Sequence, residues 1–148
     1  MIELNRFKKI LDENNNRLPL LTLDEFFEGN MAEDSIAPNQ YGFGRPSLAE
    51  IRNMLQQIEL MPSIAWIRVT LHDDTEIAKY NGKEVLQLWG DTILICTSLQ
   101  ASELEKLVNC EWLCSDGTEE CEISDLDSIF SCRPLIPDGF HCFEIVWD

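Results

Sequence analysis

The sequence predicts an α+β fold, in which an antiparallel sheet of four to five strands carries helices packed on one face. Two observations lead to this prediction. Apolar residues recur at helical spacing after Ser47, and a series of extended segments after Pro62 is interrupted only by short turns. Short turns between successive strands require antiparallel pairing, and helices cover a face of such a sheet. The chain has 148 residues and no internal repeat, so we expect one domain over residues 1–148.

The N-terminal third is expected to contain two short helices and a long loop. Apolar residues at helical spacing predict a helix within residues 2–13. Thr22 and Glu25 form a capping-box pattern, which predicts the start of a second helix that Gly29 can end. Residues 29–46 show neither helical nor strand periodicity. Unstructured stretches of that length are uncommon in compact domains and are often functional.

The clearest helical signal lies between Ser47 and Pro62. Ser47 and Glu50 form another capping-box pattern, and Pro62 ends the segment. The apolar residues in between recur at intervals of three and four, and the opposite face is polar, so this helix is expected to pack on one side only. These apolar residues are Leu48, Ile51, Leu55 and Ile58.

The first strands are expected in segments rich in β-branched residues. Apolar residues alternate over 63–72, which predicts a strand with one buried face. The Asn-Gly pair at 81–82 is the strongest hairpin signal in the chain. The segments 84–89 and 92–98 are separated only by the Gly-Asp pair at 90–91, and we expect them to form a second hairpin.

The C-terminal part is expected to add one helix and one strand. Ser102 with Glu105 resembles a capping box and predicts the start of the helix. The apolar segment 139–147 follows a Pro-Asp-Gly turn and predicts the last strand.

The charge of the chain is strongly negative and unevenly distributed. The net charge is −16, whereas residues 1–20 carry +1 and residues 100–148 carry −10. Phosphates and anionic lipids repel such a surface, so we expect neither nucleic acid nor membrane as a direct partner. No apolar run approaches the roughly 20 residues that span a bilayer. The start of the sequence shows no secretory signal, which predicts a cytoplasmic location.

Cysteines are concentrated in the C-terminal half and raise the question of a metal site. Without a secretory signal we expect them to be reduced, and to pack as small apolar side chains with no cofactor. Structural zinc requires four Cys or His ligands, mostly in closely spaced pairs. An alternative metal site would combine Cys110, Cys114 and Cys121 with a fourth ligand from Cys132, His141 or Cys142.

The sequence contains no evident catalytic set. Only His72 and His141 could act as histidine bases toward a cysteine or serine nucleophile. His141 is followed by Cys142, but neighbours on a strand point to opposite faces. A small-molecule enzyme stays open as an alternative, and a deep pocket lined by one of these histidines, with its protonation shifted, would indicate it.

Seven carboxylates within 17 residues suggest a surface for a basic partner. Clustered charge of one sign accelerates association with a partner of opposite sign, and buried aromatic anchors then supply affinity. The anchors that the sequence offers are Trp112, Tyr41 and Phe43, although for Trp112 a place in the core is preferred to a place in the interface. The carboxylates are Glu111, Asp116, Glu119, Glu120, Glu122, Asp125 and Asp127.

In its size, its strong acidity and its tolerance of cysteine, the chain resembles the immunity proteins of bacterial toxin systems. The segments LTLDEFFEGN (21–30) and DSIAPN (34–39) also resemble small bacterial proteins without an assigned role. The resemblance implies a protein that binds and blocks a toxin, often a basic nuclease, inside the producing cell. We therefore expect a non-enzymatic protein that binds a basic protein partner.

Overall fold

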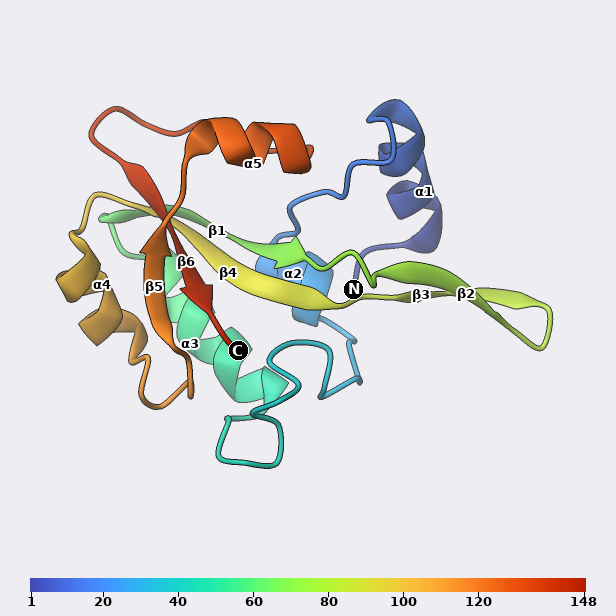
Figure 1. Cartoon of the computed structure of the whole chain (residues 1–148), viewed down its shortest axis with the longest axis horizontal. Coiled ribbons are helices and arrows are strands. Elements are labelled where there is room, and N and C mark those ends of the chain that lie inside the picture. The colour runs from blue at the N-terminus through green and yellow to red at the C-terminus, as the bar shows by residue number, and fades with distance from the viewer.

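A computed structural model describes all 148 residues and contains a four-stranded antiparallel sheet (Figure 1). Its strands are β1 (Ile64–Leu71), β4 (Gly90–Thr97), β5 (Gly117–Glu120) and β6 (His141–Val146). Their order is β1-β4-β6-β5, so the last strand in sequence lies between two earlier ones and β5 forms an outer edge. The predicted α+β class and antiparallel sheet are confirmed.

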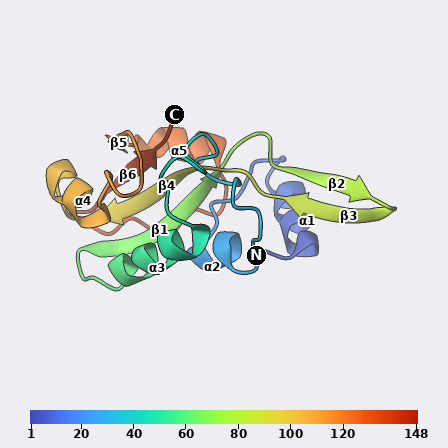
Figure 2. The same ribbon diagram turned by 90° about the horizontal axis from the view of Figure 1, so that it is seen from below.

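The first face of the sheet carries most of the core. Alternate residues of the three longer strands lie on it, because successive side chains on a strand point to opposite faces. Four helices contribute buried residues to the same cluster: α1 (Leu4–Glu13), α2 (Leu23–Phe27), α3 (Leu48–Glu59) and α4 (Ala101–Val108). Figure 2 shows α2 and α3 together on one side of the sheet. The strand residues are Ile67, Val69, Ile93, Ile95, Phe143 and Ile145.

Two of the predicted helix starts are confirmed by their capping contacts. Thr22 and Ser47 each accept a hydrogen bond from the backbone of a glutamate three residues on, and that glutamate accepts one in return. The expected N-cap of α4 at Ser102 is wrong by two residues, because the N-cap is Gln100. The helix begins at Ala101, and Glu103 accepts a hydrogen bond from the backbone N–H of Gln100 at 3.2 Å.

A short fifth helix, α5 (Ile123–Ile129), lies on the second face of the sheet and was not predicted. Its only buried residue is Leu126, which packs with Trp66, Leu94 and Leu20 in a smaller apolar cluster. One buried residue in seven leaves no helical period to recognise in the sequence. The larger helices therefore share one face as predicted, and α5 is an addition on the other.

The strands β2 (Glu76–Tyr80) and β3 (Lys83–Gln87) form a separate hairpin that extends away from the sheet (Figure 1). Asn81 and Gly82 both have positive φ, which is the geometry that the sequence predicted for this turn.

The predicted second hairpin, between β3 and β4, is wrong, because β3 pairs only with β2 and β4 pairs with β1 and β6. The Gly-Asp pair lies inside β4 rather than in a turn. Gly90 donates its N–H to the Ser35 carbonyl, and a β-carbon there would lie 2.9 Å from Phe26 Cζ, so the first residue of β4 packs closely against α2.

The segment 29–46 has no helix or strand but is held in place by Arg45, whose side chain is fully buried. Its Nη1 donates to the Ile36 carbonyl at 2.6 Å, and its Nη2 lies 3.3 Å from Glu33 Oε1. The guanidinium also stacks 5.1 Å from the ring centre of Tyr41.

None of the helices has the length and apolar character that crossing a membrane requires.

Candidate partner-binding surface

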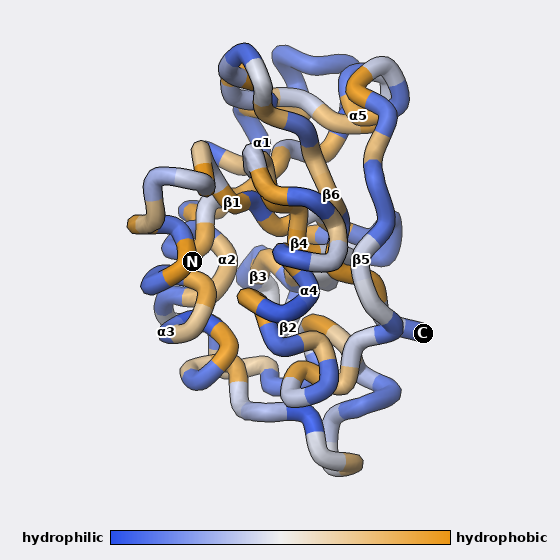
Figure 3. The backbone as a smooth tube through the Cα atoms, turned by 90° about the vertical axis from the view of Figure 1, so that its left-hand side faces the viewer, coloured by the Kyte–Doolittle hydropathy of each residue, from blue (hydrophilic) through white to orange (hydrophobic).

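The carboxylates that the sequence singled out follow the outer side of the sheet. The chain passes from the turn after α4 through the edge strand β5 and into α5 (Figure 1). Figure 3 shows hydrophilic residues along the connection between β5 and α5. All seven side chains belong to exposed residues. We call this set the acidic edge: Glu111, Asp116, Glu119, Glu120, Glu122, Asp125 and Asp127.

Internal cations neutralise only one member of the acidic edge. Arg133 pairs with both carboxylate oxygens of Asp127, at 2.5 and 3.2 Å, and its hydrogen bond lowers the pKa of Asp127. The other six carboxylates form no ion pair. Lys106 is the one other basic residue after position 100, and it is exposed on α4 without an ion pair. The acidic edge therefore keeps most of its charge.

On β5, carboxylates point to both faces of the sheet. Glu119 lies opposite Glu144 of β6, and Glu120 lies opposite Phe143. Glu144 is half-buried, and burial raises its pKa, with a smaller contribution from nearby Asp91 and Glu119. Charged residues on an edge strand also prevent other strands from adding to the sheet. The acidic edge can thus protect the sheet edge as well as attract a partner.

The three predicted aromatic anchors are accessible, and Trp112 lies within the segment that carries the acidic edge. Phe43 is 84% exposed, Tyr41 46% and Trp112 38%, so the preferred core position of Trp112 is wrong. Although their segments are far apart in sequence, they meet: a β-carbon at Gly44 would lie 3.6 Å from Cys114 Sγ, in the turn that contains Trp112. The loop that carries Phe43 therefore lies against the turn that carries Trp112.

The alternative zinc site is not assembled. No three His, Cys, Asp or Glu side chains are arranged to hold a metal ion. Cys110 packs against the core on the first face of the sheet, whereas Cys121 packs against the cluster on the second face. Cys114 lies between them in the sequence, in a turn, and has positive φ. The sheet itself separates the proposed ligands.

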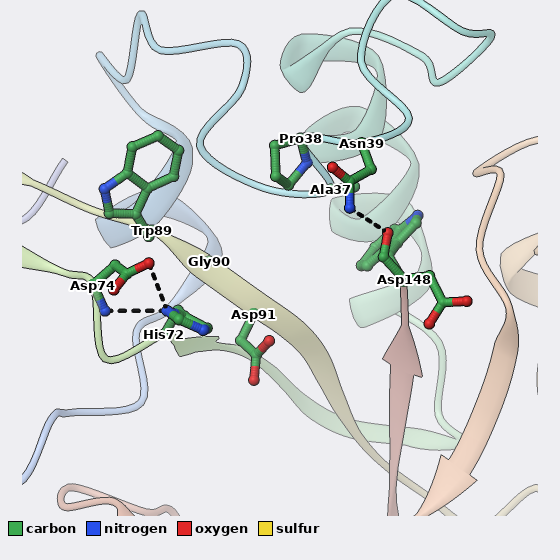
Figure 4. A pocket seen from close by; sticks show the side chains of 10 residues that line it. Ala37, Pro38, Asn39, His72, Asp74, Trp89, Gly90, Asp91 and Asp148 are labelled. Atoms are coloured by element: carbon green, nitrogen blue, oxygen red, sulfur yellow. Dashed lines mark hydrogen bonds and ion pairs between the residues drawn. The ribbon is translucent and has the colours of Figure 1, made fainter.

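A cavity of about 260 Å³ is lined by His72 at the junction of the hairpin and the sheet (Figure 4). His72 Nδ1 accepts a hydrogen bond from the backbone N–H of Asp74 at 3.1 Å and lies 3.4 Å from its carboxylate. The lining includes no cysteine or serine, so the expected pairing of a histidine base with such a nucleophile is not formed here. The other lining residues are Ala37, Pro38, Asn39, Trp89, Gly90, Asp91, Trp147 and Asp148.

The histidine of β6 is also used structurally. His141 Nε2 lies 2.7 Å from the Leu99 carbonyl, and its ring packs edge-on against Phe143. Neither histidine forms a hydrogen bond with a cysteine or serine. Trp89 and Trp147 of the cavity were not predicted as site residues, because they are far apart in sequence and no local pattern connects them.

A family model described as the uncharacterized protein YfbO family matches residues 2–145 of the chain. No curated protein and no solved structure matches it. The match covers all helices and strands apart from the final residue of β6.

Proposed function

The chain belongs to the uncharacterized YfbO family, and we propose that it is a non-enzymatic acidic protein that binds a basic protein partner. The form we favour is a cytoplasmic immunity or inhibitor protein that neutralises a toxin such as a nuclease. The observation that carries the proposal is the acidic edge, in which six of seven exposed carboxylates have no internal cation.

The physical reason is that a fold retains closely spaced like charges most easily where solvent or a cation relieves them. A lysine- and arginine-rich surface would supply such cations, and clustered charge raises association rates by roughly 10- to 1,000-fold at low salt. Long-range attraction alone gives little affinity, because rim charges mainly affect the on-rate. Phe43 and Trp112, beside the acidic edge, are accessible apolar groups that a partner can desolvate.

The experiment is affinity capture from the source cell with low-salt washes, followed by binding kinetics with the captured partner. The variant reverses Glu119, Glu120 and Glu122 to lysine. All three are exposed and unpaired, so the fold should tolerate the change. We expect the association rate to fall roughly tenfold or more at low salt, and its salt dependence to flatten.

A matched control reverses three exposed carboxylates away from the acidic edge: Asp12, Asp73 and Glu76, none of which forms an ion pair. This control changes the net charge by the same amount. If both variants slow binding equally, only net charge matters and the acidic edge has no special role. Capture of no basic protein, or an unchanged association rate in the first variant, contradicts the proposal.

A further inference from the structure

Three cysteines from distant parts of the sequence lie in one row across the sheet. Cys96 of β4 is the register partner of Cys142 of β6. Cys121, at the end of β5, continues the register of that strand and donates its N–H to the Cys142 carbonyl at 2.9 Å. All three pack in the cluster on the second face, beneath α5. None forms a disulfide in the structure.

The hydrogen-bond pattern makes Cys96 and Cys142 the closer pair. The Cys142 carbonyl bonds to Cys121, so the backbone groups of Cys142 point toward β5 and away from β4. Cys96 and Cys142 are therefore a non-hydrogen-bonded pair, in which opposite Cα atoms lie about 4.5 Å apart, against about 5.5 Å for a hydrogen-bonded pair. Both spacings fall within the range of about 4.4–6.8 Å that disulfides span.

The row also has a gradient of access and of thiol acidity. Cys96 and Cys142 are 0% and 1% exposed, whereas Cys121 is partly exposed. A hydrogen bond from Cys96 lowers the pKa of Cys142, and nearby Arg133 adds to this effect. The same hydrogen bond raises the pKa of Cys96, and burial raises that of Cys121. The central sulfur is thus the best placed to carry the thiolate, which is the nucleophile in disulfide exchange.

We propose that this row is a disulfide relay, in which a small disulfide oxidant enters at Cys121 and the bond comes to rest between Cys96 and Cys142. The Cys121 thiol is the accessible one of the three and loses its proton as it attacks the oxidant RSSR; a mixed disulfide forms, and one RS⁻ leaves and takes up that proton. The Cys142 thiolate attacks Cys121 Sγ and releases the second RS⁻. Cys96 then attacks Cys142 Sγ, its proton passes to the departing Cys121 sulfur, and Cys121 returns to a thiol. Two protein thiols are oxidised, and RSSR is reduced to two RSH.

The resting bond is expected to be readily reversible. Opposite β-carbons on paired strands lie about 4.5–5.5 Å apart, whereas a disulfide brings them to about 3.5–4.5 Å. The sheet must therefore contract locally, and strained disulfides have the higher potentials of labile or regulatory bonds. This proposal does not depend on the proposed function, because it requires only the three thiols and a small disulfide oxidant.

The test treats the full chain with glutathione disulfide and maps the products by peptide mass spectrometry after blocking free thiols. In the wild type we expect loss of two hydrogens from a linked pair of peptides that contain Cys96 and Cys142. Cys121→Ser should lose most of the rate of this reaction, because the buried pair then lacks its entry point. Cys96→Ser should instead accumulate the Cys121–Cys142 bond or a glutathione adduct on Cys121.

The matched control is Cys110→Ser, which removes a partly buried thiol on the other face of the sheet and should leave the rate unchanged. Linkage of a different pair, absence of any linkage, or an equal rate in Cys121→Ser overturns the relay. If Cys96→Ser fails to fold, the order in which the thiols are lost in the wild type decides whether oxidation enters at Cys121. Alkylation of samples taken at timed intervals measures that order. Modification of Cys121 must then precede loss of Cys96, and the reverse order overturns the proposal.

Discussion

Arg45 is the residue whose removal should most clearly loosen the segment 29–46. In Arg45→Ala, the Ile36 carbonyl loses its 2.6 Å donor and Glu33 loses its cation. A buried acceptor left unpaired costs about 1–3 kcal/mol. Glu33 is partly exposed, so loss of its ion pair with Arg45 adds about 1 kcal/mol at most to the cost of the substitution. Loss of the stacking on Tyr41 adds about 0.5–1 kcal/mol.

The cost of burying the Arg45 charge partly offsets the stabilisation that these contacts give. Desolvation lowers the pKa of Arg45, and its Nε has no hydrogen-bond partner, so the native side chain already carries part of this cost. We therefore expect a net loss of about 2–3 kcal/mol in the free energy of unfolding. Urea denaturation followed by circular dichroism measures it, and hydrogen exchange should show faster opening over residues 33–45.

Two further variants separate hydrogen bonding from packing. Arg45→Met keeps the apolar stem and should still lose more than 1 kcal/mol, roughly, because the Ile36 carbonyl stays unpaired. Arg52→Met removes a surface pair with Asp24 and should cost about 0.5–1 kcal/mol or less. If Arg45→Met is as stable as the wild type, the stabilisation does not come from the guanidinium contacts and the reasoning is refuted.

Three other substitutions test the fold. Gly90→Ala should lose about 1–3 kcal/mol in urea denaturation, because the new methyl group meets Phe26 and Ile36 at 2.9–3.2 Å; a neutral result would show that these side chains move aside freely. Ser47→Ala should lose about 1 kcal/mol in the same assay through the missing helix cap, and no loss would contradict the capping role. The pKa of Glu144 is raised in the folded chain, so its contribution to stability falls as pH rises from its ordinary range through the raised value. Glu144→Gln should therefore gain on the wild type over that interval, and a difference in unfolding free energy that is constant with pH would argue against the shift.

Local signals in the sequence predicted the local structure well. Asn81-Gly82 produced the hairpin, and the capping boxes at Thr22 and Ser47 gave two helix starts. Each depends on contacts within four residues, which a sequence pattern encodes directly. The prediction at 90–91 failed because a Gly-Asp pair is only a local turn signal. Gly90 instead packs against Phe26 and Ile36, which are distant in sequence, and it belongs to a strand.

The candidate site was only partly readable for the opposite reason. The seven carboxylates between Glu111 and Asp127 lie along one side of the sheet, because one turn, one edge strand and one helix in succession carry them. The proximity of the Phe43 loop to the Trp112 turn, and the row formed by Cys96, Cys142 and Cys121, depend on strand order. No local pattern encodes that β6 enters between β4 and β5.

The position of β6 has a consequence for how the chain folds during synthesis. β5 pairs with no strand other than β6, so residues 117–120 have no sheet to join until residues 141–146 have left the ribosome. Until then the apolar strand β4 is an open sheet edge, and its unpaired backbone groups are a template for pairing with other nascent chains. Domains generally fold from the N-terminus as they emerge, but this sheet must wait for nearly its whole length. Removal of residues 141–146 should accordingly yield insoluble protein rather than a slightly smaller fold.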